Sequence, residues 1–368
     1  MNTHPPQRHP RLQFLLAILL LGLPLAALAD MREVSFYCVR PTAMPPVIDG
    51  RLDDPCWRQA QDFTSTYEYF KPNPGPGKLK NSIRILYSEQ GLYMGILHYD
   101  KHPEKIRATV TDRDNSRLWT DDCTEIYIDA DAAAIGWRKF VVNTLGTVAD
   151  IWRIDGSVVQ EDWTAEGWET KVQVTKEGWT LETFFPWSIF GKRAKPGDIW
   201  MYCHVRYAWP DGKFVGTTSS PGGNYCATSN FGYLCFLDEG QKANVQGIAG
   251  ILKSRLSPPW CIGIDDDVIF NLGDGLQTSS LSLLLERERR RVESALSVQD
   301  VPKKLMALQE RLRGEFQAIQ AEQTPSLQQM RSLNSLAARA ENFRWSVQLE
   351  KEFNNLIPLL HGFRNKAR

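Results

Sequence analysis

Residues 117–131 read RLWTDDCTEIYIDAD, and this stretch decides the fold class. From Glu125 to Asp129, aliphatic residues alternate with polar or aromatic ones, which is the period of a half-buried β-strand. Trp119 stands before this strand in a loop rich in charged residues. The stretch carries five carboxylates, so catalysis, metal binding and the binding of a flat ligand are all compatible with it.

Similar short segments continue on both sides, from about residue 40 to residue 238. A Ser-Glu-Gln turn separates the segments 82–87 and 91–97, and Lys-Glu-Gly separates 171–174 from 179–184. Both patterns are typical of β-hairpins. Further segments of this kind are 140–143, 201–207 and 231–237. Many short strands separated by Gly and Pro predict a mainly β fold, an antiparallel β-sandwich of jelly-roll-like type.

After about residue 276 the pattern becomes that of helices. Apolar residues such as Leu305, Leu308 and Leu312 repeat at intervals of three and four. Pro358 predicts a kink near the end of the chain. The pattern predicts either a small antiparallel helical bundle or a helical arm that binds a protein partner or a second copy of the chain.

The chain opens with a segment that has the features of a secretory signal peptide. Arg8 and Arg11 precede an apolar run from Leu12 to Leu28, and small residues lead to a cleavage point after Ala29. The run is short for a membrane span, and no stop-transfer pattern follows it. We therefore expect a secreted or periplasmic protein with no transmembrane span once the leader is removed.

These patterns predict four segments along the chain. They are a signal peptide at 1–29, a β-sandwich domain at 30–238, an irregular connector at 239–275 and a helical bundle or arm at 276–368.

Composition excludes two classes of function. The chain has 43 basic and 43 acidic residues, so no basic excess favours nucleic-acid binding. Its seven cysteines show no CxxC spacing, which argues against a zinc site. Eleven of its twelve tryptophans lie between Trp57 and Trp260, in the β part of the chain.

Several blocks of the β part resemble family 9 carbohydrate-binding modules. The sequence VIDGRLDD at 47–54, followed by Trp57, is similar to the opening of that family. Later blocks keep the family's order, and they are RILY at 84–87 with Leu92-Tyr93, WTDDCTEIYID at 119–129, FVVN at 140–143, GWTLE at 178–182 with FPW at 185–187, Gly197-Asp198 and FGYL at 231–234. The resemblance covers residues 43–238 and leaves the helical part outside.

The resemblance implies a secreted, non-catalytic β-sandwich that holds the end of a polysaccharide or oligosaccharide between two aromatic rings. These rings fall on Trp119 and Tyr225, and the glutamate that hydrogen-bonds sugar hydroxyls falls on Glu125. An arginine of the family's middle strand is replaced here by Val141.

Two further polar residues are expected to hydrogen-bond sugar hydroxyls, namely Asn143 and Arg206. Arg206, His204 and Trp209 lie on a late strand and its exit loop, where they can form one wall of a pocket.

The resemblance also implies structural calcium, which takes several oxygen ligands from flexible loops. The candidate ligands are Asp112, Asp114, Asp121 and Asp122. No DxDxDG run accompanies them, and acidic loops are commonly only solvated, so both interpretations stay open.

Three alternatives to a binding module remain. A glycosidase needs two acids about 5–10 Å apart, whereas Glu125 and Asp129 are four residues apart on one strand, or roughly 13 Å, which disfavours catalysis by this pair. A noncovalent haem-binding redox domain of the same sandwich type can recruit Met94, Met201 or His204 as axial ligands, since no CxxCH motif is present. In the third alternative the helical tail is primary and serves in envelope assembly.

Overall fold

The computed structural model describes residues 31–64, 66–71, 75–154, 158–160, 162–222, 224, 226–322 and 325–366. The chain divides into two compact units. One, which we call the β domain, comprises residues 32–281 and 326–328, and the other, the helical unit, contains residues 282–325 and those from 329 onward. The predicted signal peptide at 1–29 and the predicted ligand-binding Tyr225 lie outside the described residues.

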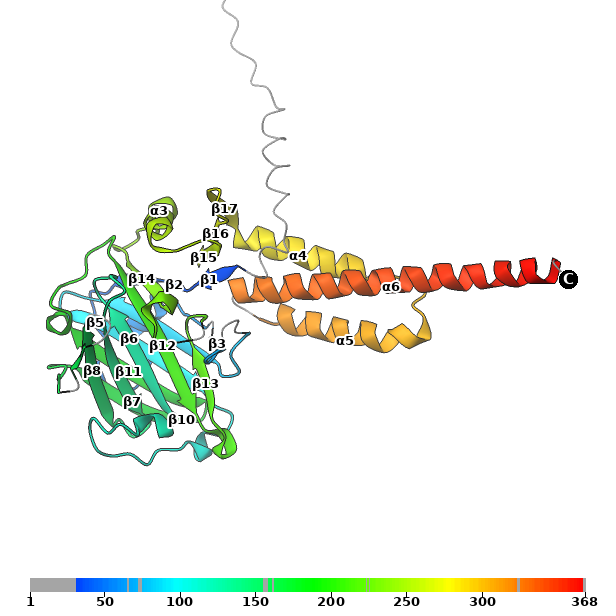
Figure 1. The fold of residues 1–368 in the computed structure, drawn as a ribbon. Helices are drawn as coiled ribbons and strands as arrows, with labels where there is room; N and C mark the ends of the chain where they lie inside the picture. The colour runs from blue at the N-terminus through cyan, green and yellow to red at the C-terminus, as the bar shows by residue number, and fades with distance from the viewer. Residues whose placement is uncertain are drawn as a thin grey trace, which may run out of the picture. The chain divides into compact units, whose positions relative to one another are not determined.

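The β domain is a sandwich of curled sheets, as the sequence predicts (Figure 1). One layer has the strand order β10-β11-β5-β4, and the other has the order β14-β12-β6-β7-β8-β9. Strand β2 joins the layers because it pairs in parallel with β14 through residues 36–39 and with β4 through residues 40–41. The strands are β1 (Arg32–Val34), β2 (Phe36–Pro41), β3 (Tyr67–Glu68), β4 (Asn81–Tyr87), β5 (Gly91–Tyr99), β6 (Cys123–Asp129), β7 (Trp137–Asn143), β8 (Val148–Ile154), β9 (Val158–Gln160), β10 (Glu169–Thr175), β11 (Gly178–Pro186), β12 (Ile199–Ala208), β13 (Val215–Thr218) and β14 (Gly232–Phe236).

The interior between the layers is rich in large side chains. Alternate residues of β6 and β7, such as Ile126 and Phe140, enter one buried cluster together with Trp179, Trp200 and Phe185. Fully buried aromatic side chains each remove about 150–250 Å² of surface from water, so they contribute strongly to folding. The tryptophan-rich composition of the β part thus mainly serves its core.

The VIDGRLDD block has a structural role. Glu182 on β11 accepts hydrogen bonds from the backbone N–H groups of Asp49 and Gly50, at 3.0 and 2.9 Å, and from the Trp57 indole at 2.8 Å. Gly50 has φ +88°, a conformation that favours glycine. Burial raises the pKa of Glu182 to about 7. These contacts fix the opening loop on the sandwich and hold the Trp57 ring inside it.

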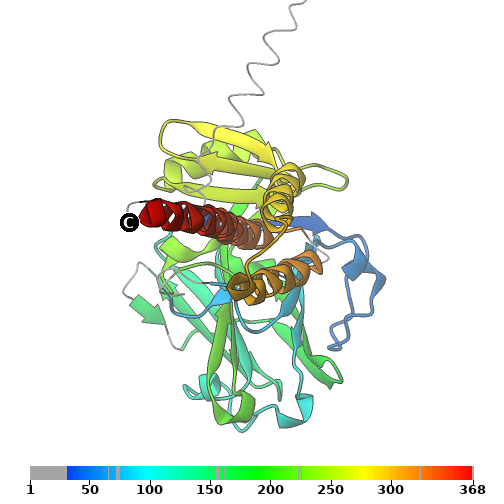
Figure 2. The same ribbon diagram turned by 90° about the vertical axis from the view of Figure 1, so that its right-hand side faces the viewer.

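The prediction of an irregular connector at 239–275 is wrong. This segment contains α3 (Val245–Arg255), β15 (Trp260–Ile264) and β16 (Asp267–Asn271), and β17 (Leu276–Ser280) follows it. Strands β15–β17 form a second sheet together with β1, which pairs in parallel with β15. Figures 1 and 2 show α3 and this small sheet on one side of the β domain.

The added segment buries the outer face of the larger layer. Ile248 and Leu252 of α3 and Trp260 of β15 share a buried cluster with Met201 and Tyr233, which belong to β12 and β14. Two glycines in α3 lower its helix propensity, and its packing surface comes from strands distant in sequence. A local pattern therefore does not reveal this layer.

The predicted helical region is confirmed, but it begins at residue 281 rather than 276, because residues 276–280 form β17. It consists of α4 (Leu281–Leu296), α5 (Lys303–Gln320) and α6 (Leu327–Lys366). The three helices share a buried core that includes Val292, Leu312 and Phe343. Pro358 lies inside α6, which continues beyond it.

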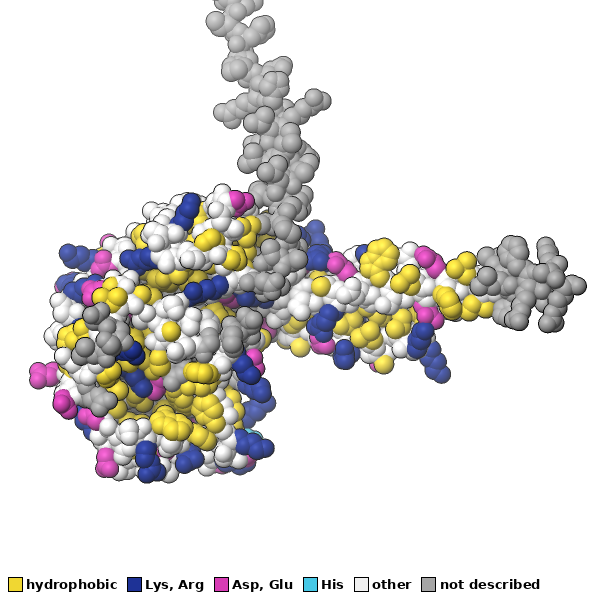
Figure 3. Space-filling view, in the orientation of Figure 1, with side chains coloured by type: hydrophobic (Ala, Val, Ile, Leu, Met, Phe, Trp, Pro, Cys, Tyr) yellow, Lys and Arg dark blue, Asp and Glu magenta, His cyan; other side chains and the backbone are white. Residues whose placement is uncertain are grey.

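The C-terminal half of α6 has an exposed apolar stripe. Trp345, Leu349, Phe353 and Leu356 lie three or four residues apart, and each is more than half exposed. Figure 3 shows hydrophobic side chains along the helical unit as far as its described end. A protein partner for these helices stays a prediction. None of the helices in the described part of the chain combines the length and apolar character needed to cross a membrane.

Candidate functional site

Trp119 lies in a short 3₁₀ turn, η3 (Leu118–Thr120), directly before β6. Leu118 is buried and anchors this turn, whereas the next side chain, Trp119, is 49% exposed. The turn is fixed by Asn115, whose carbonyl accepts the Leu118 N–H at 3.1 Å and whose side chain accepts the Arg117 N–H at 2.9 Å. The indole therefore faces solvent from a well-supported loop, as expected for a ligand platform.

Trp119 is the end of a contiguous series of rings, which we call the aromatic row. Its neighbour is Trp209, with ring centroids 6.3 Å apart and planes inclined by 39°. Trp209 lies 5.3 Å from Phe214, which lies 5.4 Å from Tyr69, and Tyr69 lies 5.6 Å from Phe70. Trp209 stands before the turn η5 (Pro210–Gly212), so the exit of β12 meets the loop before β6. The sequence places Trp209 on this exit loop but gives no signal that Trp119 and Phe214 lie beside it.

Glu125 lies on the outer face of β6 and is almost completely buried. One carboxylate oxygen lies 2.6 Å from the Lys139 Nζ, and the other accepts hydrogen bonds from the hydroxyls of Tyr127 at 2.6 Å and Tyr207 at 3.3 Å. Burial opposes the charge on Lys139, but the adjacent Glu125 outweighs it, so the pKa of Lys139 is raised. The carboxylate thus bonds to protein groups, and its predicted contact with a sugar stays a prediction.

Lys139 is a residue that the sequence reasoning missed. It precedes Val141 by two positions on β7, so both side chains project from the same face of the strand. Val141 pairs with Glu125 in the strand register. Lys139 therefore supplies a positive charge beside Glu125, two residues from Val141, the position where the family has an arginine.

Asn143 does not face solvent. Its amide nitrogen donates to the Val110 carbonyl at 2.8 Å and to Asp121 at 3.0 Å, and its oxygen accepts from the N–H groups of Leu145 and Thr147. All four hydrogen-bonding positions of the amide are satisfied inside the protein. The predicted role of Asn143 in sugar binding does not fit this geometry, and the residue instead fixes the turn after β7.

Arg206 lies on the opposite face of the larger layer from Glu125. It is completely buried and donates to the carbonyls of Lys80 and Tyr99, at 3.1 and 2.9 Å, and lies 3.5 Å from Asp100. Burial lowers its pKa to about 10. Since Glu125 is in register with Val205, Arg206 must project inward. It connects the two layers, so it does not join the predicted site.

His98 and His204 stack beside Arg206 inside the sandwich, with ring centroids 5.3 Å apart. Met201 and His204 lie on opposite faces of β12, because successive side chains of a strand alternate. These two residues therefore cannot hold one haem between them. Met94 is completely buried on β5. Haem binding is not supported by this arrangement.

The two buried histidines predict a pH-dependent stability. Burial lowers the pKa of His204 to about 3 and that of His98 well below its ordinary value of 6.5. The unfolded chain then binds more protons below pH 6.5, so stability present above that pH is lost as pH falls. Each histidine contributes a loss of about 1.4 kcal/mol per pH unit.

Denaturant unfolding between pH 7.5 and 5 measures the slope of stability against pH. Because the raised pKa values of Glu182 and Asp122 act in the opposite direction in this range, the test is a comparison of variants. His204→Gln is expected to lower the slope by about 1.4 kcal/mol per pH unit relative to the wild type. An unchanged slope in His204→Gln contradicts the assignment.

The four candidate calcium ligands do not converge. Asp121 is buried and accepts hydrogen bonds from Thr109, Val110 and Asn143. Burial favours the neutral form of this carboxyl group, but the hydrogen bonds outweigh the effect of burial and lower the pKa of Asp121. Asp122 accepts the Arg107 N–H at 2.9 Å, and burial raises its pKa to about 6.

The other two candidates, Asp112 and Asp114, are exposed, and Asp114 pairs with Arg113 at 3.1 Å. Within the described ranges, no group of three or more His, Cys, Asp or Glu residues is arranged to hold a metal ion. These acids do not fit a shared calcium site, and calcium binding stays a prediction.

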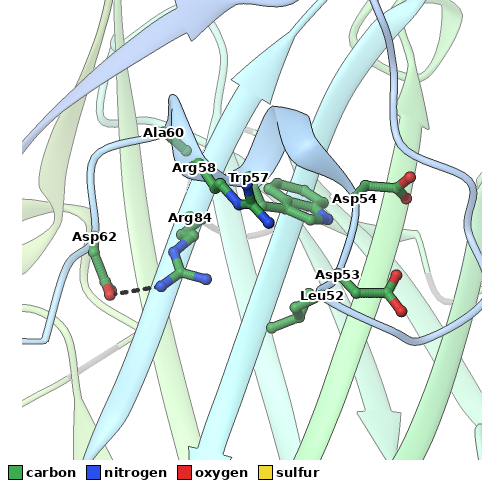
Figure 4. Close-up of a pocket in the computed structure, with 8 residues that line it drawn as sticks. All are labelled: Leu52, Asp53, Asp54, Trp57, Arg58, Ala60, Asp62 and Arg84. Atoms are coloured by element: carbon green, nitrogen blue, oxygen red, sulfur yellow. Dashed lines mark hydrogen bonds and ion pairs between the residues drawn. The ribbon is translucent and has the colours of Figure 1, made fainter.

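A pocket of about 330 Å³ lies beside the opening loop (Figure 4). Arg58 and Trp57 both line it, and Arg84 points to Asp62 at 3.0 Å. Trp57 is itself buried and bonded to Glu182, so it offers no ring face to a ligand. The aromatic row therefore remains the stronger candidate site.

A family model described as carbohydrate family 9 binding domain-like matches residues 48–238, and the chain belongs to this family. Its β domain is thus a carbohydrate-binding domain of the family 9 kind. A search of curated proteins gives no match.

Among solved structures, two complexes of a family 9 carbohydrate-binding module from Caldicellulosiruptor kristjanssonii are similar to the chain. The cellotriose complex has 17% sequence identity and a TM-score of 0.42, and the match covers 57% of this chain and 96% of that one. The glucose complex has 16% identity and the same TM-score of 0.42, with 56% and 99% covered.

Proposed function

We propose that the chain is an exported, non-catalytic carbohydrate-binding protein that holds a glycan on the exposed face of Trp119. The observation that carries this proposal is the half-exposed indole of Trp119, which packs against Trp209 at 6.3 Å. A pyranose ring can stack its C–H edges on such a face, and a mainly aromatic site with a few fixed polar groups suits ligand binding. Tyr225 remains the proposed second ring.

The arrangement of acids supports a role in binding rather than catalysis. Glu125 pairs with Lys139, and Asp129 accepts the N–H groups of Asp131 and Ala134 at 3.1 and 2.8 Å. Neither carboxylate faces the other across a space that a scissile bond can occupy. The export part of the proposal is supported by the leader sequence at 1–29.

Isothermal titration of the purified chain with cello-, xylo- and other oligosaccharides tests the proposal. Heat of binding to at least one glycan is expected, at protein concentrations that detect millimolar affinity. The absence of heat with every glycan contradicts it.

A further inference from the structure

The aromatic row offers three exposed rings to a ligand. Trp119 is 49% exposed, Phe214 is 39% exposed and Phe70 is 59% exposed, while Trp209 and Tyr69 connect them. The row contains five rings in succession, and the centroids of neighbouring rings are 5.3–6.3 Å apart. The row is therefore longer than the platform that a single sugar ring needs. Figure 3 shows that hydrophobic side chains also gather on the visible face of the β domain, among basic and acidic ones.

Basic side chains accompany this row. The guanidinium carbon of Arg107 lies 5.2 Å from the centre of the Trp209 ring. Arg117 stands two residues before Trp119, and Lys213 stands directly before Phe214, and both are exposed. Among the described residues, no carboxylate pairs with the side chains of these three cations.

The acids of the same loops are mostly neutralised. Asp211 pairs with Lys105 at 3.0 Å, and Asp114 pairs with Arg113. Asp121 and Asp122 are buried and accept backbone N–H groups.

Two loop segments supply most of these charges. Residues 101–120 and 209–214 together hold six basic and four acidic residues, whereas the whole chain has equal numbers of both. The net charge near the aromatic row is therefore positive. Asp112 is the main exposed acid of these loops for which the described residues show no ion pair.

We propose that the aromatic row binds an anionic glycan, that is, a chain of pyranose units carrying carboxylate or sulfate groups. This inference rests on the proposed function and specifies its ligand class. The exposed rings stack on sugar faces, while Arg107, Arg117 and Lys213 pair with the anionic substituents. A guanidinium binds carboxylate or sulfate oxygens through charge-assisted, bidentate hydrogen bonds, which neutral hydroxyls match less strongly.

Matched ligands test the proposal with the full chain. Oligogalacturonate is compared with its methyl ester, which keeps the backbone and removes the charge, and dextran sulfate is compared with dextran. At about 10 mM ionic strength, at least one anionic ligand is expected to bind about tenfold more tightly than its neutral counterpart. At about 1 M ionic strength, where screening is strong, this preference should largely disappear. The two pairs distinguish carboxylate from sulfate as the bound group.

Variants locate the charge effect. Arg117→Gln combined with Lys213→Gln is expected to abolish most of the preference, because the affinity for the anionic ligand falls toward that for the neutral one. Arg107→Gln is measured separately, because Arg107 also covers the Trp209 ring. Lys242→Gln, at an exposed residue before α3, is the matched control and should change neither affinity.

The outcomes separate this inference from the proposed function. Equal binding of anionic and neutral ligands, or a preference that survives Arg117→Gln with Lys213→Gln, overturns the anionic-glycan inference alone. Absence of binding to every glycan overturns both proposals.

Discussion

Trp119→Ala is expected to weaken glycan binding by about 30-fold or more. Truncation of a tryptophan that dominates a binding site costs about 2 kcal/mol or more, and about 1.4 kcal/mol corresponds to a factor of ten. Because the Trp119 ring is half exposed, its removal leaves no closed cavity in the core. Isothermal titration of wild type and variant with the best-binding oligosaccharide measures the effect.

The helical unit offers a control for this experiment. Trp345 on α6 is 57% exposed, similar to Trp119, and lies outside the residues that match the carbohydrate-binding family. Trp345→Ala should therefore leave the affinity unchanged. If Trp119→Ala binds as tightly as wild type, the platform lies elsewhere.

Lys139→Met is expected to destabilise the β domain by about 3–5 kcal/mol. The substitution leaves the Glu125 carboxylate buried without its cation, although the hydroxyls of Tyr127 and Tyr207 still donate to it. The double variant Glu125→Gln with Lys139→Met removes both charges and should recover most of this loss. Chemical denaturation of the wild type and of both variants gives the three free energies of unfolding.

A surface ion pair serves as the comparison. Lys192 lies 2.9 Å from Asp131, and both side chains are exposed. Lys192→Met should cost no more than about 1 kcal/mol, because solvent screens exposed pairs. A loss in Lys139→Met as small as that in Lys192→Met shows that the Glu125 charge is not held by Lys139.

The strands that carry clear local patterns were predictable. In β4, β5, β10 and β11 the hairpin turns are short, so each strand pairs with its neighbour in sequence. The exposed position of Trp119 also follows from its charged surroundings. The segment containing α3 and β15 was not predictable, because its apolar residues bury against strands far away in sequence.

The candidate site was predictable only in part. Alternation in β6 places Glu125 and Tyr127 on one face, and β12 alternates in the same way. Whether Arg206 and Glu125 share a face of the sheet depends on the register between β12 and β6, which are about 80 residues apart in the sequence. The local pattern does not specify that register, so the predicted ligand site wrongly included a buried arginine that connects the layers.

The β-sandwich, the helical region after it and the family can be predicted from the amino-acid sequence, because they depend on periodicity and on ordered local motifs. The support of Trp119 by Trp209, the neutralisation of Glu125 by Lys139 and the internal hydrogen bonds of Asn143 are visible only in the folded chain. Each of these contacts joins segments distant along the chain or depends on strand register. Chain folding, rather than local preference, brings such side chains together.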